Sequence, residues 1–191
     1  MNNEVQSELK KILNKRFSES ESTRLNYARG EDTYDPILSK AVVFPETNEE
    51  VSKILKLCNQ HKIPVVPFGT GTSLEGNVVG NDQGITISLE KMNKVLSVNV
   101  EDFDCKVQAC VTREQLNDYL REDGVFFPID PGANAAIGGM ASTSASGTMA
   151  VKYGTMKTVI TGLTVVLPNG DIIKTGSRTK KTSAGYNLTN L

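Results

Sequence analysis

The sequence is poor in the side chains that most often build catalytic and metal sites. It contains a single histidine, His61, and three cysteines, Cys58, Cys105 and Cys110, whose spacing does not match a metal site. A histidine-activated nucleophile would depend on His61 alone, and this residue falls at an expected helix–strand junction. We therefore expect no metal site and assign no catalytic residue. Reduced thiols are the simplest interpretation of the cysteines, which favours a cytoplasmic protein.

Excess charge and long apolar runs are also absent. The net charge is -1, whereas a general nucleic-acid binder shows a basic excess, so we expect no nucleic-acid partner. No apolar run approaches the roughly 20 residues that a membrane span requires, and residues 1–11 do not resemble a signal peptide. The 191 residues suffice for one large domain or two small ones with a substantial core.

Residues 1–36 are expected to form an N-terminal helix and an arm. Apolar residues recur at helical spacing between Val5 and Leu13 and predict an amphipathic helix over residues 3–15. Residues 18–36 are polar and irregular in pattern, and we interpret them as a linker or an arm that lies over the following domain.

The pattern over residues 37–90 predicts a small βαβ lobe. Thr47 and Glu50 form a capping box that opens a helix ending near Gln60, with Val51, Ile54, Leu55 and Cys58 on its apolar face. Strands are expected at residues 41–44, 63–67 and 84–89. The strand–helix–strand order places the loop after residue 67 at the carboxyl end of a strand, where α/β sheets bind ligands.

The pattern over residues 91–191 predicts a larger, mainly antiparallel lobe with helices. A second capping box, Thr112 with Gln115, opens a helix that ends at Gly124. Asn169–Gly170 predicts the turn of a β-hairpin. The inward residues of the helix are expected to be Leu116, Tyr119 and Leu120, and the strands to be residues 95–100, 105–111, 163–167 and 172–175. The fold class is therefore α+β, with an α/β-type first lobe.

The stretch from Ile63 to Gly76 predicts a strand that ends in a glycine-rich loop. Its glycines and hydroxyl side chains can turn backbone amides toward an anion such as a phosphate. The P-loop pattern fails because Asn77 replaces the lysine, and the dinucleotide pattern fails because Leu74 replaces the third glycine. Taken alone, the loop is equally consistent with a surface turn that binds no ligand.

A second segment, residues 127–155, is rich in Gly, Ala, Ser and Thr. A flexible linker is one interpretation. The small residues run without Gln, Glu or Lys until Lys152, which is unlike disordered composition. We therefore favour a backbone that lies close along an extended ligand. Together the two segments indicate an elongated ligand that carries phosphate.

These residues resemble the FAD-binding (PCMH-type) domain of the vanillyl-alcohol oxidase type, in its D-lactate dehydrogenase / glycolate oxidase family. The resemblance extends from about residue 35 to residue 191. It is carried by five collinear segments, residues 41–51, 64–76, 127–155, 160–176 and 180–191. It implies one FAD-binding domain over residues 37–191, with lobes at about 37–90 and 91–191.

The resemblance also implies the cofactor site. The first loop would bind the FAD pyrophosphate, the second segment would pass beside the isoalloxazine at residues 131–133, and residues 138–147 would follow the ribityl chain and diphosphate. The implied FAD-binding residues are Pro67, Phe68, Gly69, Thr70, Gly71, Thr72, Ser73, Pro131, Gly132, Ala133, Ile137, Gly138, Gly139, Ala141, Ser142, Thr143, Ser144, Gly147, Tyr153, Gly154 and Gly162.

The implied activity is oxidation of a 2-hydroxy acid, D-lactate or glycolate, to the 2-oxo acid by hydride transfer to FAD. Some related enzymes attach FAD to a histidine in the first loop. Thr72 occupies that position here, so we expect noncovalent FAD. Glu75 is expected to point to solvent. Family members are more than twice as long, and the substrate-binding cap domain is expected to be missing from these residues.

Three alternatives remain open. The chain could be a stand-alone flavin-binding or partner-binding subunit, or a glycine-rich domain that has lost flavin binding; a nucleotide triphosphatase is more distant because Asn77 replaces the phosphate-binding lysine. A flavin domain that ends at Leu191 would leave a sheet edge and apolar surface uncovered, so self-association and weakly held FAD are expected.

Overall fold

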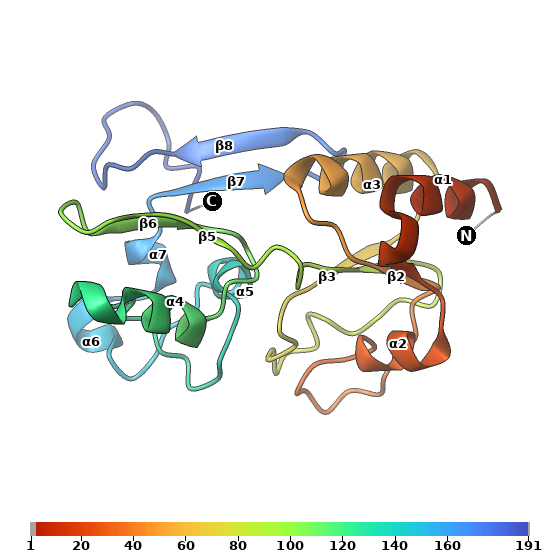
Figure 1. Cartoon of the computed structure of the whole chain (residues 1–191), viewed down its shortest axis with the longest axis horizontal. Coiled ribbons are helices and arrows are strands. Elements are labelled where there is room, and N and C mark those ends of the chain that lie inside the picture. The colour runs from red at the N-terminus through yellow and green to blue at the C-terminus, as the bar shows by residue number, and fades with distance from the viewer. Residues whose placement is uncertain (1–2, 191) are drawn as a thin grey trace. The chain divides into compact units, whose positions relative to one another are not determined.

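The computed structural model describes residues 3–190 (Figure 1). The chain divides into two compact units, which are described separately below. Unit 1 comprises residues 3–92 and Val166–Ile172, and unit 2 comprises Asn93–Val165 and residues 173–190. The α+β fold class is confirmed, since both helices and sheets build the molecule. In the described part of the chain, every helix is too short or too polar to cross a bilayer.

Unit 1 is built on a four-stranded sheet in the order β1-β2-β4-β3. The strands are β1 (Phe17–Ser18), β2 (Ala41–Val43), β3 (Val65–Phe68) and β4 (Ile85–Ser88). β2 and β3 both run parallel to β4, while β1 is antiparallel to β2. The expected strand–helix–strand order is confirmed, but β4 lies between the two strands that the helix joins. Because β4 is an inner strand, all of its residues are buried.

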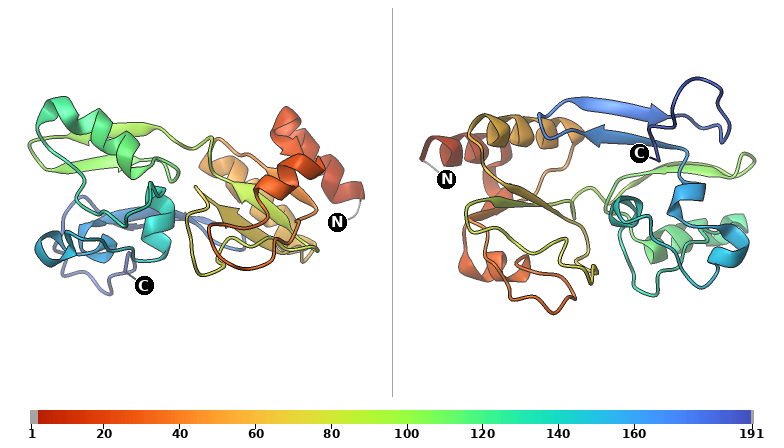
Figure 2. Two further views of the ribbon diagram at one scale, coloured as in Figure 1. Left: turned by 90° about the horizontal axis from the view of Figure 1, so that it is seen from below. Right: turned by 180° about the vertical axis from the view of Figure 1, so that it is seen from behind.

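Helices α1 (Asn3–Leu13) and α3 (Asn48–Gln60) supply the apolar core on one face of this sheet, and a short 3-10 turn, η1 (Asn14–Arg16), follows α1. Figures 1 and 2 show these helices on one side of the strands and α2 on the other. The buried core residues include the expected apolar positions of both helices; they are Val5, Leu9, Leu13, Ile54 and Cys58, packed against Ala41, Val43, Ile85 and Ile87.

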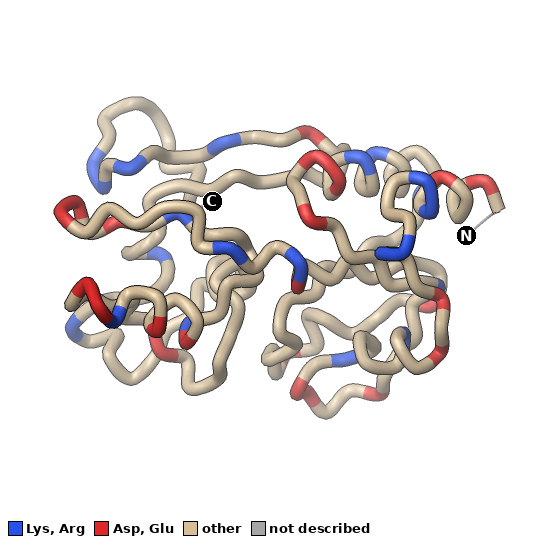
Figure 3. Tube along the Cα trace, viewed as in Figure 1, with Lys and Arg blue, Asp and Glu red and all other residues tan. Residues whose placement is uncertain are grey.

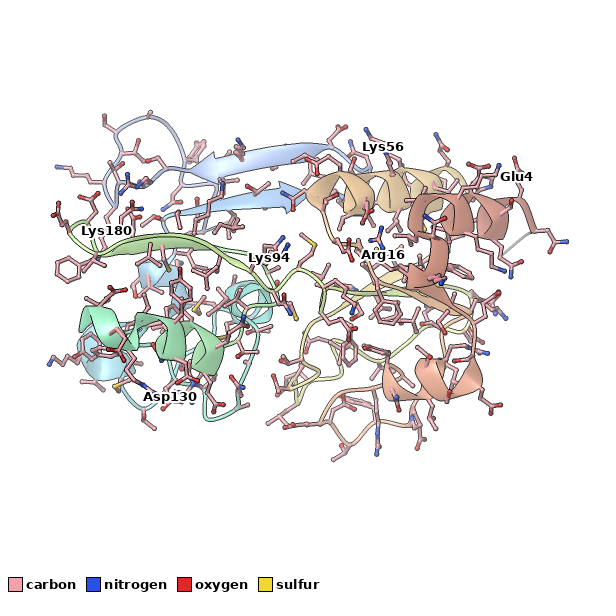
Figure 4. The ribbon with its side chains drawn as sticks, viewed as in Figure 1. Glu4, Arg16, Lys56, Lys94, Asp130 and Lys180 are labelled. Carbon is pink, nitrogen blue, oxygen red and sulfur yellow. The ribbon has the colours of Figure 1, made fainter. Side chains whose placement is uncertain are left out.

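The first predicted capping box is confirmed for the Thr47 side chain but not for the Glu50 side chain. The Glu50 amide donates to Thr47 Oγ1 at 3.1 Å, as expected. The Glu50 carboxylate instead accepts from the Glu46 amide at 2.7 Å and from both terminal nitrogens of Arg16, at 2.5 and 2.6 Å. Arg16, labelled in Figure 4, therefore ties the end of η1 to the start of α3.

The expectation of an irregular arm over residues 18–36 is wrong in one part. Residues Glu21–Asn26 form a helix, α2, because Ser20 caps it by accepting from the Thr23 amide at 3.3 Å. Residues 27–40 contain no helix or strand. They lie over the second face of the sheet, where the Ser39 hydroxyl bonds the buried Thr86 hydroxyl at 2.8 Å. The arm is thus part of the packed structure of unit 1.

Unit 2 begins with an antiparallel pair, β5 (Val95–Asn99) and β6 (Asp104–Val107). The expected strand over residues 105–111 ends early, because the chain turns at residues 108–111, where the Val111 amide donates to the Gln108 carbonyl at 3.2 Å. Cys105, on β6, is exposed.

Helix α4 (Arg113–Leu120) continues into η2 (Arg121–Asp123), and Gly124 ends it with a φ of 70°. Leu116 and Leu120 are buried as expected, but Tyr119 is 59% exposed and was wrongly assigned to the core. The Asn117 amide group holds Phe127 through two backbone hydrogen bonds, at 2.7 and 3.2 Å. The following segment therefore packs on the side of α4 that Tyr119 does not share.

The small-residue segment is more helical than an extended path would require. It forms α5 (Ile137–Ser142), α6 (Ala150–Tyr153) and α7 (Met156–Val159). Their core consists of Ile129, Met140 and Met156. The second predicted capping box is confirmed for Thr112, whose Oγ1 accepts from the Gln115 amide at 3.2 Å. The Gln115 side chain instead donates to the Asn93 carbonyl at 2.8 Å.

The expected hairpin is confirmed as β7 (Gly162–Val166) and β8 (Ile172–Gly176), joined through Asn169–Gly170. Its tip belongs to unit 1, where the Ser52 hydroxyl of α3 donates to the Gly170 carbonyl at 2.5 Å. A Cβ on Gly170 would lie 2.7 Å from the Ser52 carbonyl oxygen and 2.3 Å from Lys56 Cγ. Only glycine therefore fits this tip against α3.

Gly170→Ala should destabilise the protein beyond the cost of its positive φ. Gly185→Ala is the matched control, because Gly185 has a φ of 74° against 85° for Gly170, yet a Cβ there would have no atom within 4 Å. We expect the free energy of unfolding from denaturant titration to fall by about 1–3 kcal/mol more for Gly170→Ala than for the control. Equal losses would mean that the tip does not pack on α3.

The Arg16–Glu50 pair should make the stability of unit 1 pH-dependent. The hydrogen bond from Arg16 lowers the pKa of Glu50 below its ordinary value of 4.5. The stabilisation is therefore present above about pH 4.5 and is lost as the pH falls through the folded-state pKa. We expect Tm to fall more steeply on acidification in the wild type than in Glu50→Gln. Glu49→Gln, an exposed neighbour without an ion pair among residues 3–190, should keep the wild-type slope.

Candidate functional site

The first glycine-rich loop leaves the carboxyl end of β3 directly, as expected. Phe68, the last residue of β3, is buried, and Gly69 begins the loop. Gly71 has a φ of 73°, and a Cβ there would lie 2.8 Å from the Phe68 ring. The loop therefore folds back over Phe68 in a conformation that requires glycine. Glu75 is exposed, as expected.

The amide groups of this loop are left available for a ligand. Among residues 3–190, no protein group accepts a hydrogen bond from the amides of Gly69, Gly71, Thr72 or Ser73. The hydroxyls of Thr70 and Thr72 lie 3.4 Å apart, and the Ser73 hydroxyl donates to Asn77 Oδ1 at 2.6 Å. Several amide donors in one turn, with no cation among residues 63–90, suit an anion recognised by backbone dipoles.

The second candidate segment, in unit 2, is fixed to the start of α4. The Arg113 amide donates to the Ala135 carbonyl at 3.1 Å, and the Glu114 amide donates to Asn134 Oδ1 at 3.1 Å. Asp130, labelled in Figure 4, accepts from the Gly132 amide at 3.2 Å, and its carboxylate lies 3.7 Å from Arg113 Nε. The backbone at Pro131–Ala133 is thus held from both sides.

The glycines of this segment differ in what surrounds them. A Cβ on Gly147 would lie 1.7 Å from the Asp130 carbonyl oxygen, and one on Gly138 would lie 2.8 Å from Ala109 Cβ. Gly139 has no atom within 4 Å of that position. Gly138 and Gly147 are therefore required by packing alone, whereas Gly139 leaves open space where a ligand could approach.

The hydroxyls of α5 bond to its own backbone. Ser142 Oγ donates to the Gly138 carbonyl at 3.0 Å, and Thr143 Oγ1 donates to the Gly139 carbonyl at 3.2 Å. Ser144 follows with a φ of 49°. In this arrangement the hydroxyl groups of Ser142 and Thr143 serve the end of α5, so any contact that they make with a ligand would need them to accept rather than donate.

The last predicted site residues also have local partners. The Tyr153 ring packs edge-on against Phe126, with ring centroids 5.5 Å apart. A Cβ on Gly154 would lie 2.1 Å from Thr158 Oγ1, and one on Gly162 would lie 2.8 Å from the Thr175 carbonyl oxygen. Packing thus accounts for both glycines without a ligand.

The predicted residues fall into two groups. Pro67–Ser73 form the end of β3 and the loop after it in unit 1, and the predicted residues from Pro131 to Gly162 lie in unit 2. Sequence reasoning missed the arm residues that contact the first loop, notably Gly30, whose Cβ position lies 2.5 Å from the Gly71 carbonyl oxygen. The available signal was the Gly30–Asp32 pattern, which is typical of a tight turn.

Charged side chains are scarce along both segments. Residues 131–151 contain no Lys, Arg, Asp or Glu, so this stretch is tan in Figure 3. Within the described residues, no three His, Cys, Asp or Glu side chains gather as a metal site would require. Burial raises the pKa of the Cys58 thiol to about 11. Partial desolvation, together with the neighbouring Asp104 carboxylate, raises the pKa of Cys105, so neither thiol is an activated nucleophile. The two segments are suited to binding through the backbone.

The contrast between Gly147 and Gly139 gives a direct test of these environments. Gly147→Ala should lower Tm, because the Asp130 backbone blocks the added methyl group. Gly139→Ala should leave Tm unchanged or slightly raised, since alanine favours a helix by up to about 1 kcal/mol relative to glycine. Thermal unfolding of the two variants without ligand provides the measurement. A large loss of Tm in Gly139→Ala would show that its surroundings are not open.

Comparison with known proteins agrees with this geometry. The family described as "FAD binding domain" matches residues 39–176. A mitochondrial D-lactate dehydrogenase [cytochrome] of Arabidopsis thaliana is 44% identical over 98% of this chain, and a probable mitochondrial D-lactate dehydrogenase of Danio rerio is 49% identical over 89%. Glycolate oxidase subunit GlcD of Bacillus subtilis is 34% identical over 92%. The chain spans 34%, 35% and 38% of these three relatives.

Solved structures share the fold. Alkyldihydroxyacetonephosphate synthase superposes with a TM-score of 0.86 at 22% identity, over 99% of this chain and 37% of that one. p-Cresol methylhydroxylase with substrate bound has a TM-score of 0.78 at 26% identity, over 91% of this chain and 35% of that one. The available amides and the glycine cradle at Gly71 fit a diphosphate-bearing cofactor. The chain therefore belongs to the PCMH-type FAD-binding domain family, and FAD is its cofactor.

Proposed function

We propose that this chain is the flavin-binding part of a dehydrogenase that oxidises a 2-hydroxy acid, D-lactate or glycolate, to the corresponding 2-oxo acid. The names of the relatives support this assignment, and so does the share of their length that the chain matches, about a third. When bound, FAD supplies the ring that accepts the hydride. The residues of this chain bind and orient the cofactor.

The observation that carries the proposal is the loop after β3. It presents the amides of Gly69, Gly71, Thr72 and Ser73 without an acceptor among residues 3–190, at the carboxyl end of a parallel strand. We assign this loop to the FAD pyrophosphate, since backbone amides grouped in one turn can stabilise two negative phosphates without a lysine.

The second segment is assigned to the rest of the cofactor. Pro131–Ala133 would lie beside the isoalloxazine, held in position by Asp130 and the start of α4. Gly139, with open space at its Cα, would let the backbone approach the ribityl chain. No residue here is assigned as the catalytic base. We propose that substrate binding and proton removal belong to the part of the relatives' length that this chain does not match.

The cofactor is proposed to be held noncovalently. Thr72 occupies the position at which some related enzymes carry a flavin-linked histidine, and a threonine hydroxyl cannot form that bond. The only histidine of the chain, His61, lies exposed at the end of α3. FAD should therefore be released in full by acid precipitation, with no flavin fluorescence left on the protein in a denaturing gel.

A second candidate is a flavin-binding subunit that acts with a partner or with a second copy of itself. It is favoured by large apolar side chains on the surface of unit 2, including Phe103 at 83% exposure and Tyr186 at 94%.

A cytoplasmic location is proposed from the three cysteines, which form no disulfide within residues 3–190. Several relatives carry mitochondrial names.

Titration of the purified chain with FAD tests the proposal. We expect saturable quenching of flavin fluorescence and a rise in Tm with FAD concentration. Gly71→Ala should weaken binding by about tenfold or more, because a methyl group at a φ of 73° meets the Phe68 ring. Gly185→Ala, with a φ of 74° and open surroundings, should bind like the wild type.

Turnover tests where substrate binding lies. The chain loaded with FAD should not reduce an artificial acceptor with D-lactate or glycolate when it is alone. Absence of FAD binding in a folded protein would contradict the proposal. Turnover of either acid by the chain alone would contradict the assignment of substrate binding to unmatched parts of the relatives.

A further inference from the structure

The arm before the family-matched region supports the loop that we assign to the pyrophosphate. The family match begins at residue 39, whereas the arm residues that contact the loop lie between Tyr27 and Tyr34. All of these residues belong to unit 1. The contacts reach the loop at its start, its middle and its end.

The middle contact is a backbone hydrogen bond. The Glu31 amide donates to the Gly71 carbonyl at 2.9 Å. The Gly71 carbonyl and the Thr72 amide belong to one trans peptide plane, so they point in opposite directions. Holding the carbonyl toward the arm therefore turns the Thr72 amide, which has no acceptor among residues 3–190, away from the arm.

Close packing accompanies this bond. A Cβ on Gly30 would lie 2.5 Å from the Gly71 carbonyl oxygen and 2.9 Å from the Ser73 carbonyl oxygen. The arm and the loop thus meet backbone to backbone, with no room for a side chain at residue 30. Any larger residue there would push the loop carbonyls, and with them the amides on the other side of each peptide plane.

A buried carboxylate fixes the shape of the arm at this point. Asp32 is only 7% exposed, and its two oxygens accept from the amides of Gly30 and Tyr34 at 3.2 and 3.0 Å. These bonds form a tight turn around Glu31, which holds its amide in place. The Glu31 side chain itself is exposed.

Aromatic contacts hold the two ends of the loop. The Tyr27 ring packs edge-on against Phe68 with centroids 5.0 Å apart, and its hydroxyl donates to Glu90. A Cβ on Gly76, which has a φ of 71°, would lie 2.8 Å from the Tyr34 ring. The arm therefore contacts this region at Phe68, at Gly71, at Ser73 and at Gly76.

We propose that the turn Gly30–Asp32 is a positioning element for FAD, in which the Glu31 amide holds the Gly71 carbonyl and so directs the Thr72 amide toward the pyrophosphate. This inference rests on the proposed function for the identity of the ligand. Gly30, Glu31 and Asp32 position the loop, and the loop in turn binds the cofactor.

The test compares Glu31→Pro with Glu31→Ala. Proline removes the amide donor, whereas alanine keeps it and changes only an exposed side chain. We expect Glu31→Pro to weaken FAD binding by about three- to tenfold, the value of a single net hydrogen bond. Its visible circular dichroism with FAD should also differ from that of the wild type. Glu31→Ala should match the wild type in both measurements.

A second pair guards against a proline that merely disturbs folding. Asp32→Ala removes both acceptors of the turn, whereas Asp32→Asn keeps one acceptor oxygen. We expect Asp32→Asn to recover part of the FAD affinity that Asp32→Ala loses. In the FAD-free proteins, hydrogen exchange of residues 69–73 should be faster in Glu31→Pro than in Glu31→Ala.

The outcomes separate the two claims. If the wild type binds no FAD but exchange in the loop still depends on the Glu31 amide, the proposed function fails and the positioning of the loop by the arm stands. If the wild type binds FAD and the proline and alanine variants bind it equally, the positioning role is overturned. Equal loop exchange in the two variants would overturn it as well.

Discussion

The backbone amides of the loop after β3 are the feature on which the functional interpretation of this chain depends. Backbone amides in folded proteins almost always find an acceptor in the protein or in water. Those of Gly69, Gly71, Thr72 and Ser73 have no acceptor among residues 3–190, so water or a ligand must satisfy them. β3 holds one side through its ladder with β4, and the arm holds the other through the Gly71 carbonyl.

The glycines of the chain serve two physical purposes that a sequence does not distinguish. Gly147 and Gly170 are surrounded by backbone atoms that an added methyl group would strike, so packing explains them without any ligand. Gly139 has open space instead, where a ligand could approach its backbone. Glycine content alone therefore does not identify which residues of unit 2 would approach a ligand.

Local signals predicted much of the fold. The Thr47 cap with four apolar positions defined α3, and Asn169–Gly170 defined the hairpin. Features that depend on distant partners were missed. The Glu50 carboxylate turns to Arg16, 34 residues earlier, and Tyr119 is exposed because Asn117 draws the next segment to another side of α4. The order β2-β4-β3 likewise depends on pairing that no local pattern records.

The first site loop was predictable because its glycines follow a strand, whereas its support by the arm arises from contacts across about 40 residues of chain between Glu31 and Gly71. The proposed function predicts that FAD contacts residues of both glycine-rich segments. Amide chemical shifts of the 15N-labelled protein during FAD titration test it most directly. We expect saturable shifts at Gly69, Gly71 and Thr72 in unit 1 and at Gly132 and Gly139 in unit 2. Shifts confined to one segment, or spread without preference for either, would contradict it.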